Sequence, residues 1–339
     1  MRAAVVEGPG RAPAPAEVPK PRRGRGEALV RIHAAALNPV ELHIWNGHFF
    51  DGPPRPPYVI GLEGVGVVEE GERLAPGTRV RVEFVHPGYG RNGAVAEYAL
   101  APEEPDASDR ASQAAVAAID DELDDVAVAA LGVPVFTALM CLERAQQAGA
   151  SLGGAHVLVV GATGAVGAVA VQLAKLLGAA RVVAAGRSTE RLERALDLGA
   201  DATVALHGDL TADELRSRFS DAGHGRIDVA LDPLWGVPAR AAVDALTRDG
   251  VYVSFGQAAA PSAELSGIPL RNRRVTMVGH SGAWATPQER QAALRRAHEL
   301  AARAGTRLTL DTDEIPLSEI GTGWEWLARS AGRRLVVRP

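Results

Sequence analysis

The chain has 339 residues, of which 47% are hydrophobic and 23% charged, a balance typical of a globular protein large enough for two domains with buried cores. A net charge of −5 and a pI near 6.0 give no electrostatic footprint for a nucleic-acid partner. No apolar run reaches the roughly 20 residues that span a bilayer, and the opening MRAAVVEGPG lacks the apolar segment of a signal peptide. We therefore expect no membrane partner and a cytoplasmic location.

The segment 1–102 consists of short β-like stretches separated by Gly/Pro turns such as EGPGRAP and LAPGT. The stretches read RAAVV, EALVRIHAAAL, GVGVVEE, RVRVEF and AVAEYAL, and they predict an antiparallel or barrel-like β domain. Residues 111–125 are rich in Ala and acidic side chains, which favours a helix over a strand. The next segment, VAVAALGVPVFTALMCLERAQQAG, has the helical spacing of Val135, Leu139 and Leu142.

From His156 onward, apolar strands alternate with amphipathic helices. The predicted strands read HVLVVG, RVVAAG, ATVAL, IDVALD, VYVSFG and VTMVG, and helices are predicted at 165–177, at 189–198 and near PARAAVDALTR. This alternation predicts an α/β domain with a parallel, doubly wound sheet. Residues 310–339 return to mixed short segments that end in RRLVVRP, a β-like tail that we expect to rejoin the first domain.

A glycine-rich turn joins the first of these strands to its helix in VLVVGATGAVGAVAVQLAKLLGA. Gly161, Gly164 and Gly167 have the spacing GxxGxxG rather than GxGxxG. Such glycines allow a tight turn, close approach of the backbone to a pyrophosphate and close packing of helix on strand. A turn of this kind can also simply reverse the chain, but its place in the alternating pattern predicts dinucleotide binding. The expected contacts are Gly161, Thr163, Gly164, Ala165, Val166 and Gly167.

The choice of cofactor is expected at the end of the next strand, where an acidic side chain would bind the ribose hydroxyls of NAD. Here VVAAGRSTERLER offers Gly186, Arg187, Ser188 and Arg191, and no carboxylate before Glu190. This set suits a 2′-phosphate, so NADPH is the predicted cofactor. The alternative is that Arg187 is a solvated loop residue and that Ser188 only caps the following helix.

Several motifs together resemble the medium-chain dehydrogenase/reductase superfamily, and within it the zinc-free quinone oxidoreductase group. In chain order they read NPVELHIWNG, PYVIGLEGVGVVEEGERLAPGTRVRVE, GAVAEYAL, ALGVPVFTALMCL, VLVVGATGAVG, LGADATVAL, IDVALDPLWG and GVYVSFG. The resemblance implies a GroES-like β-barrel catalytic domain at 1–122 that is completed by 285–339. It also implies a Rossmann NADPH-binding domain at 123–284, a small-molecule substrate and a homodimer.

The zinc-dependent branch of the superfamily provides a test for a metal. Its catalytic zinc is held by a Cys where this chain has Asn38 and by the His of a Gly-His-Glu motif where this chain has Leu62. Leucine cannot bind zinc, and an amide is a poor substitute for a thiolate. Because Cys141 is the only cysteine, a structural zinc site of four thiolates is excluded as well. We expect no metal.

Without a metal, the reaction must rely on polarisation by hydrogen bonds, which suits hydride addition to the β-carbon of an enone or quinone. The resemblance makes His43 the first choice for proton donor, assisted by Asn38 or Glu41. A histidine that only holds its loop, an Asn that forms a turn and a solvated Glu are the alternatives. Trp45 and Tyr89 are expected in the substrate pocket, although either could be a packing residue.

Further cofactor contacts are carried over from the resemblance. They are Thr137, Phe255, Gly256, Gly279, His280, Ser281 and, in the blurred tail motif, Arg333. The predicted function is zinc-independent, NADPH-dependent reduction of an activated alkene, an enone or a quinone, with a natural-product tailoring role in view. The alternatives are an NADPH-dependent carbonyl reductase, a member that binds the cofactor without turnover, and a cleft repurposed for a non-redox reaction such as a cyclisation.

Overall fold

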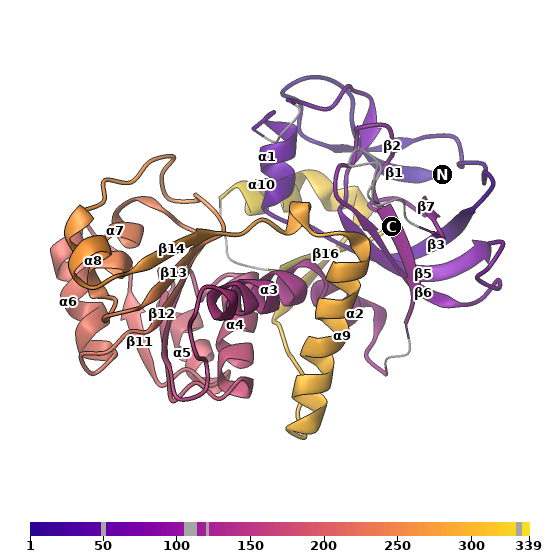
Figure 1. Cartoon of the computed structure of the whole chain (residues 1–339). Coiled ribbons are helices and arrows are strands. Elements are labelled where there is room, and N and C mark those ends of the chain that lie inside the picture. Colours follow the sequence, from indigo (N-terminus) through magenta and orange to yellow (C-terminus); the bar gives the residue numbers. More distant parts are fainter. Residues whose placement is uncertain (49–51, 105–113, 120–121, 330–333) are drawn as a thin grey trace. The chain divides into compact units, whose positions relative to one another are not determined.

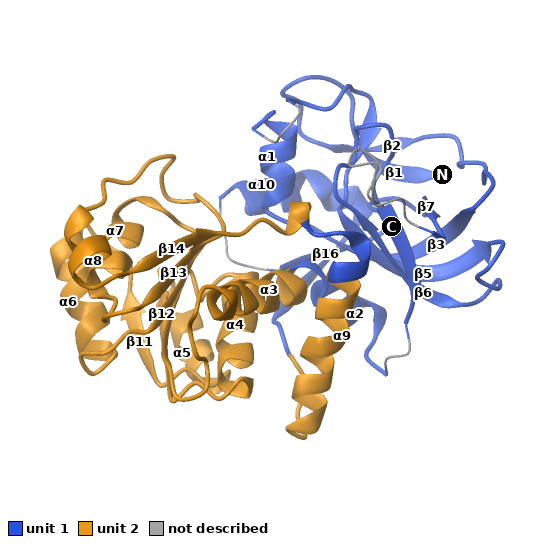
Figure 2. Ribbon diagram, in the orientation of Figure 1, with its two compact units in different colours: residues 1–133, 285–289, 309–339 blue, residues 134–284, 290–308 orange. Residues whose placement is uncertain are grey.

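The computed structural model describes residues 1–48, 52–104, 114–119, 122–329 and 334–339. Arg333, an expected cofactor contact, lies outside the described residues. The chain divides into two compact units (Figure 2). Unit 1 comprises Met1–Val133, Ala285–Glu289 and Thr309–Pro339, and unit 2 comprises Pro134–Trp284 and Arg290–Leu308. Residues 123–133 therefore group with the first unit and 290–308 with the second, which differs from the expected boundaries.

In the described part of unit 1, a mixed sheet has the strand order β15-β16-β3-β5-β6-β8, and β7 also pairs with β3 (Figure 1). A second sheet has the order β2-β1-β4. The strands are β1 (Arg2–Val6), β2 (Ala14–Glu17), β3 (Glu27–Ala36), β4 (Tyr58–Val59), β5 (Glu63–Glu70), β6 (Arg79–Phe84), β7 (Tyr98–Pro102), β8 (Ala114–Ala118), β15 (Thr312–Pro316) and β16 (Arg334–Arg338). The helices are α1 (Val40–Trp45), α2 (Asp125–Ala130), the 3₁₀ turn η3 (Leu317–Glu319) and α10 (Ile320–Ala328).

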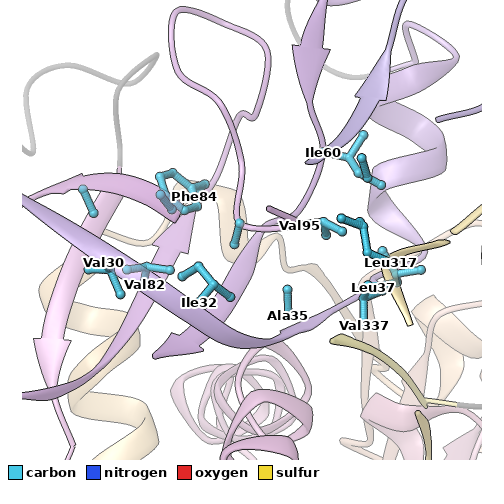
Figure 3. Packing of buried hydrophobic residues seen from close by; sticks show 14 of the residues in the cluster. Val30, Ile32, Ala35, Leu37, Ile60, Val82, Phe84, Val95, Leu317 and Val337 are labelled. Atoms are coloured by element: carbon cyan, nitrogen blue, oxygen red, sulfur yellow. The ribbon is translucent and has the colours of Figure 1, made fainter. Parts of the chain in front are cut away.

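Alternate side chains of these strands form the core of unit 1. Val30 and Ile32 of β3 lie beside Val82 and Phe84 of β6 in the buried cluster (Figure 3). Full burial of each such side chain stabilises the fold by about 1.5 to 3 kcal/mol. Because β16 pairs antiparallel with β3, the C-terminal tail rejoins the first unit as expected.

The helix expected over 111–125 was wrong where the structure describes it. Ala114–Ala118 form strand β8, which pairs antiparallel with β6, and Val82 is opposite Val116. Helix α2 begins only at Asp125. The side chain of Asp124, its N-cap, accepts a hydrogen bond from the backbone N–H of Ala127. Alanine favours a helix by only a few tenths of a kcal/mol per residue, which is less than a strand gains by pairing on a buried sheet edge.

Unit 2 is built on a parallel sheet with the strand order β11-β10-β9-β12-β13-β14 (Figure 1). Its strands are β9 (His156–Val160), β10 (Arg181–Gly186), β11 (Ala202–Ala205), β12 (Val229–Asp232), β13 (Val251–Ser254) and β14 (Thr276–Gly279). Its helices are α3 (Val133–Gln147), α4 (Ala165–Leu176), α5 (Thr189–Asp197), α6 (Ala212–Ala222), α7 (Gly236–Ala245), α8 (Gly267–Asn272), the 3₁₀ turn η2 (Gly282–Trp284) and α9 (Pro287–Arg303), whose first residues belong to unit 1. The predicted doubly wound fold is confirmed, and the order of strands reverses at β9, the place where such sheets bind ligands.

Candidate cofactor cradle and catalytic site

The glycine-rich turn lies at the carboxyl end of β9. Gly161 has φ +70°, and a Cβ placed there would lie 2.8 Å from Cγ of Pro233. A Cβ on Gly167 would lie 2.3 Å from the carbonyl oxygen of Gly161. Gly164 is the N-cap of α4 and makes no side-chain hydrogen bond to the helix. The turn therefore needs glycine at positions 161 and 167, and it leaves the first amides of α4 available to a phosphate.

A second loop, after β10, lies against this turn. A Cβ on Gly186 would lie 2.3 Å from Cγ2 of Thr163, so the two loops are in close contact. Nη1 of Arg191 donates a hydrogen bond to the Thr163 carbonyl at 3.4 Å. The Ser188 hydroxyl accepts one from the Arg191 amide, also at 3.4 Å, and so caps α5. Arg187 is exposed, and within the described residues its guanidinium makes no ion pair.

The remaining predicted cofactor residues of unit 2 fall into two groups at this same edge of the sheet. Phe255 and Gly256 follow β13, and a Cβ on Gly256 would lie 2.5 Å from the carbonyl oxygen of Pro233. Gly279, His280 and Ser281 end β14 or follow it, and a Cβ on the adjoining Gly282 would lie 3.7 Å from Oγ1 of Thr137. The structure thus brings Thr137 of α3 next to the loop that follows β14.

His280 of this loop has an unusual imidazole. Its amide donates to the Ser254 carbonyl at 2.8 Å, which fixes the loop on β13. Burial and the neighbouring Arg144 lower the pKa of His280 to about 4. The ring is therefore uncharged at neutral pH, and it adds no positive charge to the cradle.

In unit 1 the Asn38 amide belongs to a buried ionic network. Its Nδ2 donates to Oε1 of Glu63 at 3.0 Å, and its Oδ1 accepts from Nη1 of Arg334 at 2.8 Å. Arg334 and Glu63 also form a direct ion pair, and Oε2 of Glu63 accepts from the Val133 amide at 2.8 Å. Both ends of the Asn38 amide are thus occupied by protein groups. Its use on a substrate carbonyl remains a prediction.

Glu41 lies behind Asn38 at the start of α1 and is buried. Its Oε1 accepts a hydrogen bond from the backbone N–H of Asn38 at 3.0 Å. Its Oε2 is buried without a hydrogen-bond partner among the described residues. Burial, reinforced by the nearby Glu63 charge, raises the pKa of Glu41 to about 8, although the amides of Asn38 and Gly61 oppose the rise. Glu41 therefore carries a proton at neutral pH.

His43 lies two residues further along α1 and is half-buried. Burial, together with the neighbouring His48, lowers the pKa of His43, so its ring is uncharged at neutral pH. No protein hydrogen bond to this ring is found within the described residues, so nothing there shows it holding the loop. Its ring N–H is a donor that a ligand could use.

The two residues expected in the substrate pocket have different surroundings. Nε1 of Trp45 donates to the Arg11 carbonyl at 2.7 Å, and its ring meets Trp324 edge-on with centroids 6.0 Å apart. Trp45 is thus held between the loop that carries Arg11 and helix α10. The Tyr89 hydroxyl donates to the Gly52 carbonyl, and its ring lines a cavity of about 770 Å³ within unit 1. The residues that line this cavity do not include Asn38, His43 or Trp45, so the structure does not bring Tyr89 and Trp45 together in one pocket.

The donor groups present do not fit a catalytic zinc. Leu62 contributes an apolar, buried side chain, and the Asn38 oxygen is already bound to a guanidinium. Over the residues that the structure describes, no cluster of three or more His, Cys, Asp or Glu could hold a metal ion. A buried cation is present instead, in Arg334. Sequence reasoning missed Arg334 and Glu63, because their pairing joins segments 271 residues apart.

Comparison with known proteins agrees with this architecture. Residues 165–299 match the family model "Zinc-binding dehydrogenase", and residues 24–106 match "Alcohol dehydrogenase GroES-like domain". An alcohol dehydrogenase of Geobacillus stearothermophilus is 30% identical over 93% of this chain and 92% of its own length. A quinone oxidoreductase of Lama guanicoe is 29% identical over 90% of this chain and 86% of its own. The solved quinone oxidoreductase of Thermus thermophilus, also determined in complex with NADPH, is 28% identical, covers 100% of both chains and has a TM-score of 0.78.

A GroES-like unit and a Rossmann unit with a nicotinamide-type glycine turn define an oxidoreductase. The chain belongs to the medium-chain dehydrogenase/reductase superfamily, and the predicted fold class is confirmed. The family binds a nicotinamide cofactor, which the cradle described above fits. Within its described residues, the chain has no helix that is long and apolar enough to cross a membrane.

Proposed function

We propose that this oxidoreductase reduces an activated alkene, an enone or a quinone, with NADPH and without zinc. The main support for the proposal comes from the side chains at the two positions where the zinc-dependent branch has its zinc ligands. One holds Leu62, and the other holds the Asn38 amide, which is bound to Arg334 and Glu63. Without a Lewis acid, a saturated ketone is poorly activated, whereas a conjugated alkene accepts hydride with help from a hydrogen-bond donor.

The cradle supports NADPH as the cofactor. Gly161, Gly164 and the first turn of α4 would hold the pyrophosphate, and Arg187 with Ser188 and Arg191 would hold the 2′-phosphate. No carboxylate occupies the end of β10, where NAD-binding proteins place one. When bound, NADPH supplies the hydride that is added to the β-carbon of the substrate.

His43 is the proposed donor to the substrate oxygen. Its uncharged ring offers an N–H to the oxygen that becomes negative as hydride arrives. The protonated carboxyl of Glu41, two residues away, is a proton source buried in the same helix. Asn38 fixes the start of this helix. Its backbone N–H donates to Glu41, and its side chain hydrogen-bonds within the network of Arg334 and Glu63.

The proposal is tested by following NADPH absorbance with a panel of enones, quinones and saturated ketones, after metal analysis of the same sample. We expect turnover of enones or quinones by protein that contains far less than one zinc per chain. Turnover of saturated ketones alone would instead indicate a carbonyl reductase. Binding of NADPH without oxidation by any member of the panel, or stoichiometric zinc, would contradict the proposal.

A further inference from the structure

A buried carboxylate stands at the carboxyl end of β12, next to the glycine turn. Asp232 is fully buried, and its Oδ2 accepts a hydrogen bond from the Tyr252 hydroxyl at 2.5 Å. Its Oδ1 accepts from the Leu234 amide at 2.6 Å, and the Trp235 amide lies 3.2 to 3.3 Å from both oxygens. Asp232 has no ion-pair partner in unit 2, which is described throughout. A buried carboxylate held only by hydrogen bonds is costly, so each of its donors matters.

These hydrogen bonds fix the loop from Pro233 to Trp235 in an uncommon conformation. Trp235 has φ +62°, a region that a non-glycine residue rarely adopts, and its ring lies against that of Tyr252 with centroids 6.2 Å apart. Such a conformation costs about 1 to 3 kcal/mol and persists only where the surroundings enforce it. The Asp232 carboxylate and the Tyr252 ring provide this enforcement.

The loop in turn contacts both parts of the predicted cradle. A Cβ placed on Gly161 would lie 2.8 Å from the Pro233 ring. A Cβ placed on Gly256 would lie 2.5 Å from the Pro233 carbonyl oxygen. The Pro233 carbonyl also accepts from the Ala258 amide at 3.1 Å. Because β12 is the neighbour of β9 on the far side from β10, this contact lies where the order of strands reverses.

We propose that Asp232 and Tyr252 are positioning residues for the nicotinamide dinucleotide, which act by holding Pro233 against Gly161. The inference rests on the proposed NADPH dependence, and it concerns a pair that the glycine motif does not contain. If the Tyr252 hydroxyl is removed, the loop is free to relax away from Gly161, and the amides of the turn lose their alignment toward the pyrophosphate. The adenosine end of the cofactor, on the side of Arg187, is unaffected.

The test compares Tyr252→Phe with a matched variant at the opposite edge of the same sheet. There the Thr247 hydroxyl donates to the Ile227 carbonyl at 2.8 Å and lies 3.1 Å from Oδ1 of Asp228, so Thr247→Val also removes a hydroxyl that contacts an Asp, in this case a partly buried one. Both variants are expected to lower the melting temperature. By calorimetry, Tyr252→Phe is expected to weaken NADPH binding about tenfold, and Thr247→Val by less than about twofold.

A cofactor fragment separates a local effect from general loosening. Adenosine 2′-monophosphate keeps the 2′-phosphate but has neither phosphate of the pyrophosphate, so we expect Tyr252→Phe and the wild type to bind it equally. Unchanged NADPH affinity in Tyr252→Phe, or an equal loss for NADPH and the fragment, would overturn the positioning role while leaving NADPH dependence intact. Failure of the wild type to bind NADPH would overturn both.

Discussion

Nη1 of Arg334 donates to Oδ1 of Asn38 at 2.8 Å, across 296 residues of sequence. The same guanidinium is paired with Glu63, so one buried cation joins strand β16 to the start of β5 and to Asn38, two residues before α1. The positive charge at this point in the fold is thus supplied by the protein itself. The helix that carries His43 and Glu41 is attached to this network through Asn38.

Replacing Arg334 by Met should be strongly destabilising. It would leave the buried Glu63 carboxylate with only its longer ion pair to Arg81, at 3.7 Å, and removal of one partner of a buried pair costs about 3 to 5 kcal/mol in free energy of unfolding. Arg338→Met is the matched control, because Arg338 lies on the same strand in an exposed pair with Glu314. We expect a loss of at most about 1 kcal/mol there. Equal losses in urea denaturation would show that the buried network has no special role.

Glu41 should make the protein less stable as pH rises. Its pKa is about 8 in the folded protein against an ordinary 4.5, so the folded state binds the proton more tightly than the unfolded state between these values. Stability must therefore fall through this window and level off above it. Glu41→Gln mimics the protonated carboxyl, so at pH 8 we expect it to be more stable than the wild type, by about 4 kcal/mol. Parallel stability-versus-pH curves for both proteins would show that Glu41 is not the group responsible.

Arg187→Ala should weaken NADPH binding about 10- to 100-fold, the usual range for a hydrogen bond between charged groups. NADH lacks the 2′-phosphate, and its affinity should not change. Arg194→Ala, on helix α5 that follows Arg187 and paired with the exposed Asp197, is the control. Calorimetric titration with both dinucleotides measures the effect. If the two variants bind NADPH alike, the 2′-phosphate is held elsewhere.

His43→Gln should lower kcat/KM by about 100- to 10,000-fold, as expected on loss of a group that donates in the transition state. NADPH affinity should stay the same, which separates this loss from unfolding. Because the pKa of His43 is lowered, the ring is already uncharged at pH 7, so its titration should not change wild-type activity from pH 7 to 8; a fall in that range should come from Glu41, whose pKa is about 8. His48→Gln, in the exposed residues after α1, should be nearly neutral. Similar losses in both variants would indicate a structural role for the histidines.

Much of unit 2 could be predicted because its signals are local. A short apolar strand, a glycine turn and an amphipathic helix follow one another directly, and Gly161 with α4 appears where this pattern places it. Strand β8 was misread, because its pairing with β6 decides its structure and alanine composition does not. Helices α9 and α10 were not predicted, although the charged spacing of α9 and the apolar face of α10 are visible in the sequence.

The candidate site was predictable only in part for the same reason. Asn38, Glu41 and His43 could be picked from one short motif, but what each side chain contacts depends on distant residues. Arg334 fills the hydrogen-bonding capacity of Asn38, and Tyr252 holds Asp232 from the neighbouring strand. The spacing of residues along the sequence indicates neither of these contacts. Buried polar networks of this kind become visible only once the strands are placed.

The most direct test of the central claim is the fate of the hydride. NADPH deuterated at the transferred position would be incubated with an enone and with protein shown to be free of zinc, and the product analysed by mass spectrometry and NMR. We expect a saturated ketone that carries deuterium on its β-carbon. Deuterium on the former carbonyl carbon, or transfer only after zinc is added, would contradict it.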